Sequence, residues 1–345
     1  MRIQKDKLKK QYFWGMILVT GATGLVGAHL CLRLLQQNQS FVALFRREKK
    51  RQSTLDFLAK QAVPASAIAT IEWRKADLCT LPELTMAFDG ITRVYHCAAY
   101  VSMAYFKRHY LTEVNQQGTS DLVNLCIEKK VKKLAYVSSI AALGSDPSAK
   151  EINEETPWNP VQEKTPYAYS KYGAELEVWR AAQEGVPVVI VNPGVILGLG
   201  MPGSPLAQLV RQLRKGMRRV PPGSTGYVAV EDVVDVLIHL MKSDIHNERY
   251  ILVAENWTYK KMMVFVARCL GIKPPTRPLR SGVLYALFIG EYILSSMGMR
   301  KRFLSRALIK SLTEKQIING GKIKTTMDFD YRPIDSYLQQ QLVSF

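Results

Sequence analysis

The sequence predicts an α/β protein in which a doubly wound parallel sheet is followed by a smaller, irregular C-terminal lobe. Three observations predict this fold. Short apolar runs alternate with helix-periodic segments over residues 16–195, which is the order of a sheet built from strand–helix units. The runs are almost continuously apolar, as expected of parallel strands covered on both faces. Three spaced glycines follow the first run, where a strand would turn into a helix.

Strands and helices are expected in regular order in this first part. The apolar run 16–20 predicts the first strand, and the periodicity of 25–36 predicts the helix after it. Two longer helices are expected over 111–129 and 167–184. The remaining strands are expected at 41–45, 69–76, 93–99, 133–139 and 186–194.

After Pro193 the regular order ends. The elements expected there are loops rich in glycine and proline at 198–205 and 221–226, a helix at about 231–243, a short strand at 250–254, and a helix capped by Thr258 that runs to Cys269. We therefore divide the chain into a domain of residues 16–195 and a region 196–345, which mainly forms the second lobe and sends some segments back to the sheet. Residues 1–15 are a basic leader without the apolar core of a secretory signal. They are interpreted as a flexible arm, a tag or a mis-assigned start.

Composition narrows the classes of protein that this chain can be. Of its 345 residues, 47% are hydrophobic, which excludes a disordered chain. The 5 cysteines are scattered and form no CxxC pair, so we expect neither a disulfide framework nor a metal site, and we interpret the protein as reduced and cytoplasmic. A net charge of +18 suits anionic ligands, nucleic acid or an acidic membrane surface. Because no RNA- or DNA-binding module accompanies the charge, no nucleic-acid partner is expected.

The glycines lie in the segment TGATGLVG, residues 20–27. Gly21 permits a tight turn, Gly24 lets backbone N–H groups approach a pyrophosphate, and Gly27 lets helix and strand pack closely. The strand before and the helix after provide the context that a dinucleotide-binding loop requires. The sequence therefore predicts a Rossmann-type site for a dinucleotide, bound by Gly21, Thr23, Gly24, Leu25, Val26 and Gly27.

The ends of the next two strands indicate which dinucleotide is bound. Arg46 and Arg47 stand at the end of the second strand, where an acidic residue would accept a hydrogen bond from a free ribose hydroxyl. Arginine pairs with a 2′-phosphate there, so NADP(H) is favoured over NAD(H). The alternative is that these arginines simply begin a solvated basic helix. Asp77, which closes the third strand, is expected to touch the adenine ring.

A tyrosine and a lysine four residues apart, Tyr167 and Lys171, begin a predicted helix. This spacing places them on one face of the helix, and a nearby ammonium favours the phenolate of a tyrosine, whose pKa is otherwise about 10. Ser139 ends the fifth strand, where it is placed to share a hydrogen bond with a reacting oxygen. Position alone does not separate it from Ser138, and the preference for Ser139 comes from the family resemblance described next. Tyr169 faces elsewhere on the helix and is expected to pack.

Taken together, these residues resemble the extended short-chain dehydrogenase/reductase family over roughly residues 16–260. The resemblance implies that Tyr167 is the acid/base, that Lys171 orients the nicotinamide ribose and lowers the pKa of the tyrosine, and that Ser139 polarises the carbonyl. His96, at a strand end, is expected to order the loop that follows, and Cys97 is expected to be a packing residue rather than a nucleophile. The resemblance also implies that Asn115 supports the active-site backbone and that the cofactor is lined by Asp77, Leu78, Ala98, Ala99, Pro193, Gly194 and Val195. A homodimer formed through the helix of Tyr167 and its neighbour is expected from the family alone.

Departures from the patterns of related enzymes narrow the chemistry. Ile140 and Ala141 follow Ser139, where dehydratases of this family carry Asp-Glu. Gly226 stands where sugar-nucleotide epimerases place an arginine, although other arginines lie nearby at 211, 214, 218 and 219. The resemblance is therefore to the branch of dihydroflavonol reductases and 3β-hydroxysteroid dehydrogenases.

This branch implies an enzyme, an NADP-dependent oxidoreductase that transfers hydride between the nicotinamide and a small-molecule carbonyl or secondary alcohol. The region 196–345 is expected to form mainly the substrate-binding lobe of this enzyme. One alternative is a sugar-nucleotide epimerase with tightly bound NAD(P). A second alternative is a non-catalytic sensor that binds NADP(H).

The most apolar stretch of the chain is 282–299. It is apolar on all sides for two turns, which favours a helix buried in the second lobe or at a subunit contact. A peripheral membrane contact, helped by Arg300, Lys301, Arg302 and Arg306, is a less favoured alternative. A spanning helix is least favoured, because the segment carries Glu291 and lies at the lower length limit for crossing a bilayer. The stretch also fits a lipophilic substrate.

Overall fold

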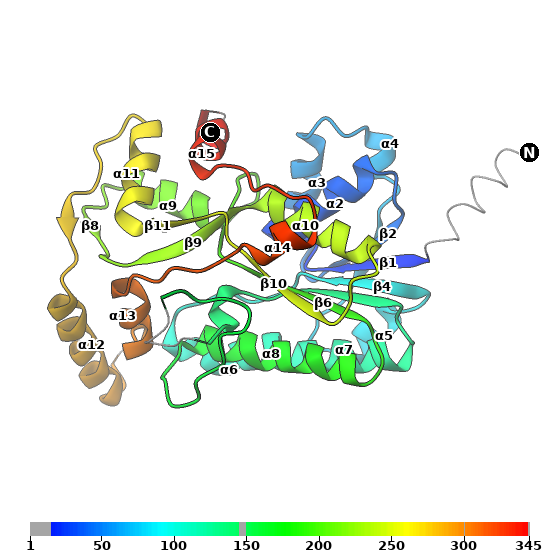
Figure 1. The fold of residues 1–345 in the computed structure, drawn as a ribbon, viewed down its shortest axis with the longest axis horizontal. Coiled ribbons are helices and arrows are strands. Elements are labelled where there is room, and N and C mark those ends of the chain that lie inside the picture. Colours follow the sequence, from blue (N-terminus) through cyan, green and yellow to red (C-terminus); the bar gives the residue numbers. More distant parts are fainter. Residues whose placement is uncertain (1–14, 145–149, 300, 344–345) are drawn as a thin grey trace, which may run out of the picture.

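A computed structural model describes residues 15–144, 150–299 and 301–343 of the chain. Within these residues the predicted doubly wound sheet is confirmed. It has seven strands in the order β10-β6-β5-β4-β1-β2-β3, and each neighbouring pair is parallel. Figure 1 labels five of these strands, β1, β2, β4, β6 and β10, between the helices that cover the sheet. The strands are β1 (Met16–Thr20), β2 (Phe41–Phe45), β3 (Glu72–Lys75), β4 (Ile91–His96), β5 (Lys133–Val137), β6 (Val188–Pro193) and β10 (Glu248–Leu252).

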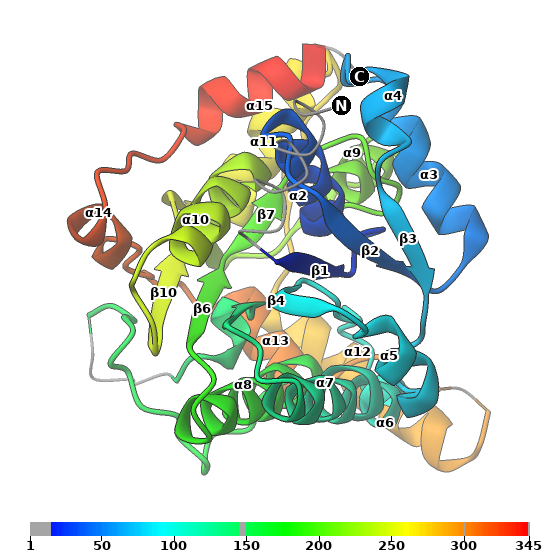
Figure 2. The same cartoon turned by 90° about the vertical axis from the view of Figure 1, so that its right-hand side faces the viewer.

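Helices cover both faces of this sheet, as Figure 2 shows from the side. One face is covered by α2 (Leu25–Gln36), α3 (Glu48–Ala59) and α10 (Val230–Lys242), and the other by α5 (Leu81–Ala87), α7 (Gly118–Glu128) and α8 (Pro166–Gln183). Each face of the sheet has its own core. The first core lies between the sheet and helices α2 and α10, and the second between the sheet and helices α7 and α8. In β1, Ile17 and Val19 enter the first core, whereas Leu18 enters the second. Because successive side chains point to opposite faces and both faces are buried, the whole strand is apolar.

Some boundaries differ from the predicted ones. β4 ends at His96 rather than at 99, because its partner strand β1 ends at Thr20, which pairs with His96. The helix expected over 111–129 is built from α6 (Arg108–Leu111), a π-helical segment η2 (Thr112–Gln117) and α7. π-helical turns inside helices are rare and often occur at functional sites.

The region after residue 195 forms a smaller sheet with its own core. In the described part of the chain this sheet has the order β11-β9-β7, from β7 (Val195–Leu197), β9 (Ser224–Ala229) and β11 (Glu255–Thr258). Its core contains side chains from α9 (Pro205–Arg214), α11 (Tyr259–Cys269) and α15 (Ile334–Val343). Thr258 caps α11 as expected, since its hydroxyl accepts a hydrogen bond from the N–H of Lys261 at 3.1 Å.

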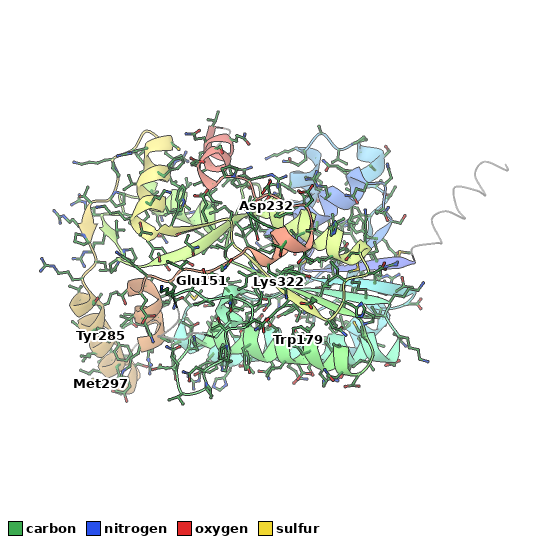
Figure 3. All side chains as sticks on the ribbon, in the orientation of Figure 1. Glu151, Trp179, Asp232, Tyr285, Met297 and Lys322 are labelled. Atoms are coloured by element: carbon green, nitrogen blue, oxygen red, sulfur yellow. The ribbon has the colours of Figure 1, made fainter. Side chains whose placement is uncertain are left out.

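Two segments of this region return to the central sheet. The strand expected at 250–254 is β10, which pairs with β6 at the sheet edge, and α10 packs on the first core. Arg332 in the C-terminal segment forms an ion pair with the buried carboxylate of Asp232 on α10. Asp232 is labelled in Figure 3. The remaining short elements are α4 (Ala65–Ile68), η1 (Tyr105–Lys107), η3 (Ile140–Ala142), β8 (Arg219–Val220), β12 (Arg277–Pro278), α13 (Arg306–Thr313) and α14 (Lys322–Thr326).

The apolar stretch 282–299 forms helix α12 (Ser281–Ser296), but its expected burial inside the second lobe is wrong. Of the described residues of α12, Leu284 and Phe288 are buried, in a small cluster with Ile309 of α13. The other large apolar side chains are exposed, because α13 covers one side of a helix that is apolar on all sides. Arg300 and the leader residues 1–14 lie outside the described residues. Within the described residues, no helix combines the length and apolarity needed to cross a membrane.

Candidate active site

The glycine loop between β1 and α2 has the backbone that a dinucleotide needs. Gly21 has a positive φ of 66°, and a Cβ there would lie 2.6 Å from the backbone nitrogen of Ala98. A Cβ on Gly27 would lie 2.1 Å from the carbonyl oxygen of Gly21. Among the described side chains, none caps α2 at Gly24, so the first N–H groups of the helix face the loop. These residues fit a pyrophosphate group at the helix N-terminus.

Arg46 lies beside this loop, at the end of β2. Its Nη1 atom donates to the hydroxyl of Tyr110 at 3.0 Å and to the Asp77 carboxylate, just after β3, at 3.3 Å. The hydrogen bond with Tyr110 and the charge of Asp77 raise the pKa of the guanidinium, so it stays charged. Arg47 immediately precedes α3 and is exposed. The structure thus places Arg46 and Asp77 together at the carboxyl edge of the sheet.

Tyr167 and Ser139 are also brought together at this edge. Thr165 caps α8 by accepting from the N–H of Ala168 at 3.1 Å, which places Tyr167 in the first turn of the helix. Burial raises the pKa of Tyr167 to about 12, and a hydrogen bond with Ser139 acts in the opposite direction. Ser139 begins η3, where its hydroxyl accepts from the N–H of Ala141 at 3.1 Å.

Lys171 lies one turn further along α8 and is fully buried. Its amine donates to the hydroxyl of Tyr136 at 2.6 Å and to the carbonyl of Val137 at 2.8 Å, both on β5. Burial lowers the pKa of Lys171 to about 7. The ammonium was expected to lower the pKa of Tyr167, whereas in this arrangement burial governs that pKa and raises it.

The buried amine of Lys171 makes stability depend on pH. In the unfolded chain the amine keeps its proton up to about pH 10.5, so between pH 7 and 10 the unfolded state binds the additional proton. The contribution of Lys171 to stability therefore rises with pH across this window and is least favourable below pH 7. Relative to Lys171→Met, we expect the wild type to gain about 1 kcal/mol of unfolding free energy per pH unit. Urea unfolding of both proteins from pH 7 to 10 measures this difference. Parallel stability curves would contradict it.

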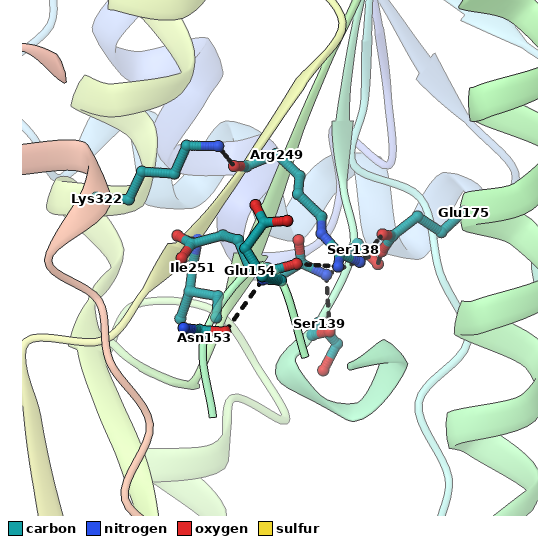
Figure 4. Close-up of polar contacts among 10 residues, drawn as sticks. Ser138, Ser139, Asn153, Glu154, Glu175, Arg249, Ile251 and Lys322 are labelled. Carbon is teal, nitrogen blue, oxygen red and sulfur yellow. Dashed lines mark hydrogen bonds and ion pairs between the residues drawn. The ribbon is translucent and has the colours of Figure 1, made fainter. Parts of the chain in front are cut away.

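Figure 4 shows a polar network behind Ser139. The buried carboxylate of Glu175, on α8, accepts from the hydroxyl of Ser138 at 2.7 Å and from the side-chain amide of Asn192 at 2.8 Å. The same amide donates to the carbonyl oxygen of Ser139 at 3.1 Å. Arg249 of β10 pairs with Glu175 at 3.2 Å. The two serines therefore differ, because Ser138 faces this network while Ser139 faces Tyr167.

Sequence reasoning did not identify Tyr136, Glu175 and Arg249. A weak signal existed for Glu175, since it stands four residues after Lys171 and thus on the same face of the helix. Tyr136 lies within an apolar strand run, where a tyrosine is indistinguishable from a packing residue. Arg249 reaches the site through strand pairing with β6, which no local pattern indicates.

Asn115 lies on the π-helical segment and holds the loop after β4. Its amide oxygen accepts from the N–H of Tyr100 at 2.7 Å, and its nitrogen donates to the carbonyl of Tyr100 at 2.9 Å and to the hydroxyl of Ser170 at 2.9 Å. Ser170 in turn donates to the carbonyl of Tyr167. Asn115 therefore connects this loop to the first turn of α8.

His96 bridges two threonines in the interior. Nδ1 of its ring lies 2.7 Å from the hydroxyl of Thr20, and Nε2 lies 3.0 Å from that of Thr119. Burial lowers the pKa of His96 to about 3 and raises the pKa of the Cys97 thiol to about 12. Both groups are therefore neutral near pH 7. The neutral imidazole of His96 links Thr20 to Thr119, and the protonated thiol of Cys97 is a poor nucleophile.

The other predicted cofactor residues lie around the same edge. The N–H of Ala98 donates to the hydroxyl of Thr20 at 3.3 Å, and buried Leu78 contacts Gly118. Gly194 donates to the carbonyl of Leu252 at 3.0 Å, and a Cβ there would lie 2.4 Å from the carbonyl oxygen of Gly226. Pro193 ends β6, Val195 begins β7, and Ala99 is exposed in the loop after β4.

Comparisons with known proteins identify the family of the chain. Residues 17–252 match the model of the NAD dependent epimerase/dehydratase family. The chain is 30% identical to sterol demethylase protein B of Methylococcus capsulatus, covering 88% of each chain, and 29% identical to a putative dihydroflavonol 4-reductase of Synechocystis, covering 81% of this chain and 80% of that one.

Solved structures share the fold. The crystal structure of gox2253 superposes with a TM-score of 0.78 at 26% identity and covers 95% of this chain and 97% of that one. The UDP-glucose 4-epimerase of Thermotoga maritima superposes with a TM-score of 0.73 at 17% identity and covers 95% of this chain and 97% of that one, a likeness of fold alone.

The family match covers most of the chain and includes the glycine loop, Ser139, Tyr167 and Lys171. Relatives named putative dihydroflavonol 4-reductase and vestitone reductase are among the similar proteins, at 29% and 27% identity, in keeping with the branch that the sequence resembles. The chain belongs to the NAD-dependent epimerase/dehydratase family and is an NAD(P)-dependent enzyme of the extended short-chain dehydrogenase/reductase type.

Proposed function

We propose that this enzyme is an NADP-dependent carbonyl reductase, or alcohol dehydrogenase in the reverse direction, and that Tyr167, Ser139 and Lys171 form its catalytic site. The observation that carries the proposal is the hydrogen-bonded pair of Tyr167 and Ser139 at the sheet edge that also holds the glycine loop. The names of the reductases among the relatives support a carbonyl as the substrate group.

The chemistry follows from the protonation of Tyr167. Because its pKa is about 12, the phenol keeps its proton at neutral pH and can donate it to a carbonyl oxygen. The hydroxyl of Ser139 can donate a second hydrogen bond to the same oxygen as negative charge develops on it. When bound, NADPH supplies the hydride that the carbonyl carbon receives. Hydride and proton together convert the ketone or aldehyde to an alcohol, and the phenolate of Tyr167 recovers its proton from water.

Lys171 and Asn115 act in this proposal by holding the site. Lys171 fixes the end of β5 next to Ser139 through Tyr136 and Val137, and it would reach the nicotinamide ribose from there. Asn115 fixes the loop after β4 and, through Ser170, the backbone of Tyr167. Pro193, Gly194 and Val195, with Ala98 and Ala99, would surround the nicotinamide.

Arg46 is proposed to recognise the 2′-phosphate of NADP(H). The change Arg46→Glu replaces a cation by an anion at that position, so we expect the Kd for NADPH to rise about 100-fold, or about 2.7 kcal/mol, while the Kd for NADH changes much less. Equilibrium titration of nucleotide-free protein with each cofactor measures both constants. Lys60→Glu, at the other end of α3, makes the same change in net charge and should leave both constants unchanged. Equal losses for NADPH and NADH in Arg46→Glu would show that the arginine does not recognise the phosphate.

The reaction itself is tested by substrate panels. With NADPH present, ketones and aldehydes should be reduced at the expense of cofactor absorbance. UDP-hexoses, offered to the same protein, test the alternative reaction, because an epimerase interconverts them without net cofactor consumption. Conversion of UDP-hexoses with no reduction of any carbonyl would overturn the proposed function.

We also propose a homodimer formed through α7 and α8. Tyr169 and Leu176 are large apolar side chains on α8 that are exposed in the single chain. α8 packs beside α7 on the outside of the sheet, so the two helices together offer a broad face to a second copy.

A further inference from the structure

Helix α12 exposes a contiguous apolar surface. The patch, which we call the α12 patch, consists of the exposed side chains Tyr285, Leu287, Ile289, Tyr292, Ile293 and Met297. Figure 3 labels Tyr285 and Met297 at the outer end of the molecule, on the side toward which the carboxyl ends of the central strands point. Large exposed apolar patches on folded proteins mark surfaces that bind a partner or a membrane.

The α12 patch continues into a loop near the candidate active site. The N–H groups of Tyr105 and Phe106, in the segment after β4, donate to the carbonyls of Phe303 and Arg302 at 3.0 Å each. Phe106 and Val101 are exposed in this segment, as is Phe303. The apolar surface therefore extends from α12 to the loop that Asn115 holds at the edge of the central sheet.

Cations border this surface. The amines of Lys107 and Lys301 lie 5.5 and 5.7 Å from the centre of the Phe106 ring, and the guanidinium of Arg302 lies 3.9 Å from that of Tyr105. The acidic Glu291 of α12 is already engaged, since its carboxylate accepts from the N–H groups of Phe303 and Leu304 at 3.0 and 2.9 Å. Apolar and aromatic side chains bordered by lysine and arginine complement an anionic lipid surface.

The length of α12 determines whether it can cross a bilayer or only lie on its surface. α12 has 16 residues, or about 24 Å, which is less than the hydrocarbon thickness of about 30 Å. A symmetric contact between two copies of the chain through this patch is disfavoured, because it would bring the same cations of both copies near one another. We propose that the α12 patch docks the protein on the surface of an anionic bilayer, with α12 lying in the interface and the segment after β4 that carries Phe106 on the same side. The docking does not rest on the proposed reaction.

The test is co-sedimentation of full-length protein with vesicles. Vesicles made of equal parts of phosphatidylcholine and phosphatidylglycerol should bind the wild type, and the double variant Ile289→Gln with Ile293→Gln should bind about tenfold more weakly. These residues are 55% and 52% exposed, so the change removes little packing. The control variant, Leu81→Gln with Met86→Gln, replaces two exposed apolar residues of α5 at the other end of the molecule and should bind as the wild type does. Vesicles of pure phosphatidylcholine should bind the wild type more weakly.

Other outcomes would overturn the proposal. If the α12 variant binds anionic vesicles as tightly as the wild type, binding comes from the general positive charge or the basic leader. If no vesicle binds the wild type, or if the variant loses self-association in sedimentation velocity runs without lipid, the patch is not a lipid-binding surface. Amide hydrogen exchange of the wild type gives a second measurement without mutation, because exchange over 281–296 should slow when anionic vesicles are added. Unchanged exchange there would contradict the proposal.

Discussion

Replacing Tyr167 by phenylalanine is expected to lower kcat for carbonyl reduction by about 10³-fold and to leave the Kd for NADPH nearly unchanged. The phenylalanine ring fills the same buried position, so the fold should persist. The variant lacks the proton that the phenol donates to the carbonyl oxygen and the hydroxyl that pairs with Ser139. Stopped-flow or steady-state assays measure the rate, and fluorescence titration measures cofactor binding.

Tyr169→Phe is the matched control for this variant. Tyr169 lies two residues away on the same helix, and its hydroxyl accepts from the N–H of Lys164 at 3.4 Å rather than pairing with Ser139. Tyr169→Phe keeps the ring, so losing this hydroxyl should change neither the rate nor cofactor binding. If Tyr167→Phe keeps its activity, the assignment of the acid/base is wrong. If it loses NADPH binding along with activity, the hydroxyl holds the cofactor rather than donating the proton.

Replacing Glu175 by alanine is expected to reduce the free energy of unfolding by about 3–5 kcal/mol. The change leaves the buried hydroxyl of Ser138 without its acceptor, and it removes one of the two acceptors of the Asn192 amide and the carboxylate that pairs with the partly exposed guanidinium of Arg249. Polar groups and charges that lose their partner in the interior retain the full cost of leaving water. Urea unfolding at pH 7 measures this loss, and Glu175→Gln should lose less, because an amide can still pair with Ser138.

Glu177→Ala serves as the control, because Glu177 lies on the same helix and also pairs with an arginine. Its pair with Arg180 is partly exposed, so the loss should stay within about 1 kcal/mol. Equal losses in Glu175→Ala and Glu177→Ala would show that burial of the network adds nothing to its stabilising effect.

The parts of the fold that could be predicted are those that local sequence determines. The apolar run of β1, the periodicity of α2 and the glycines between them lie within about twenty residues, and all three appear in the structure as predicted. The strand that became β10 was predicted, but its position in the sheet was not. Its neighbour β6 lies about sixty residues earlier in the chain, and pairing at that distance leaves no periodic pattern in the sequence. The exposure of α12 could not be predicted either. A helix that is apolar on all sides is expected to be buried, but the pattern does not show whether the rest of the same chain covers it.

In the candidate site too, local spacing could be predicted from the sequence, whereas contacts between distant elements could not. The spacing of Tyr167 and Lys171 was readable from the sequence, but the contact of Lys171 with Tyr136 depends on how α8 lies against β5. Ser138 and Ser139 are chemically identical, and what separates them is a carboxylate contributed by a different element. Such distinctions require the packing of whole elements, which the sequence specifies only through the complete fold.

The return of α10 and β10 to the central sheet bears on how this enzyme can be recombined with its relatives. A chimera that exchanges residues 196–345 as one block would replace the strand that pairs with β6 and the helix that covers the first core. It would also replace Arg249, the cation that faces Glu175. Breakpoints placed before α10 and after β10 would instead keep residues 230–252 with their parent. Such a chimera must also retain Arg332, the partner of buried Asp232 in α10, if the central sheet and its helices are to keep their native contacts.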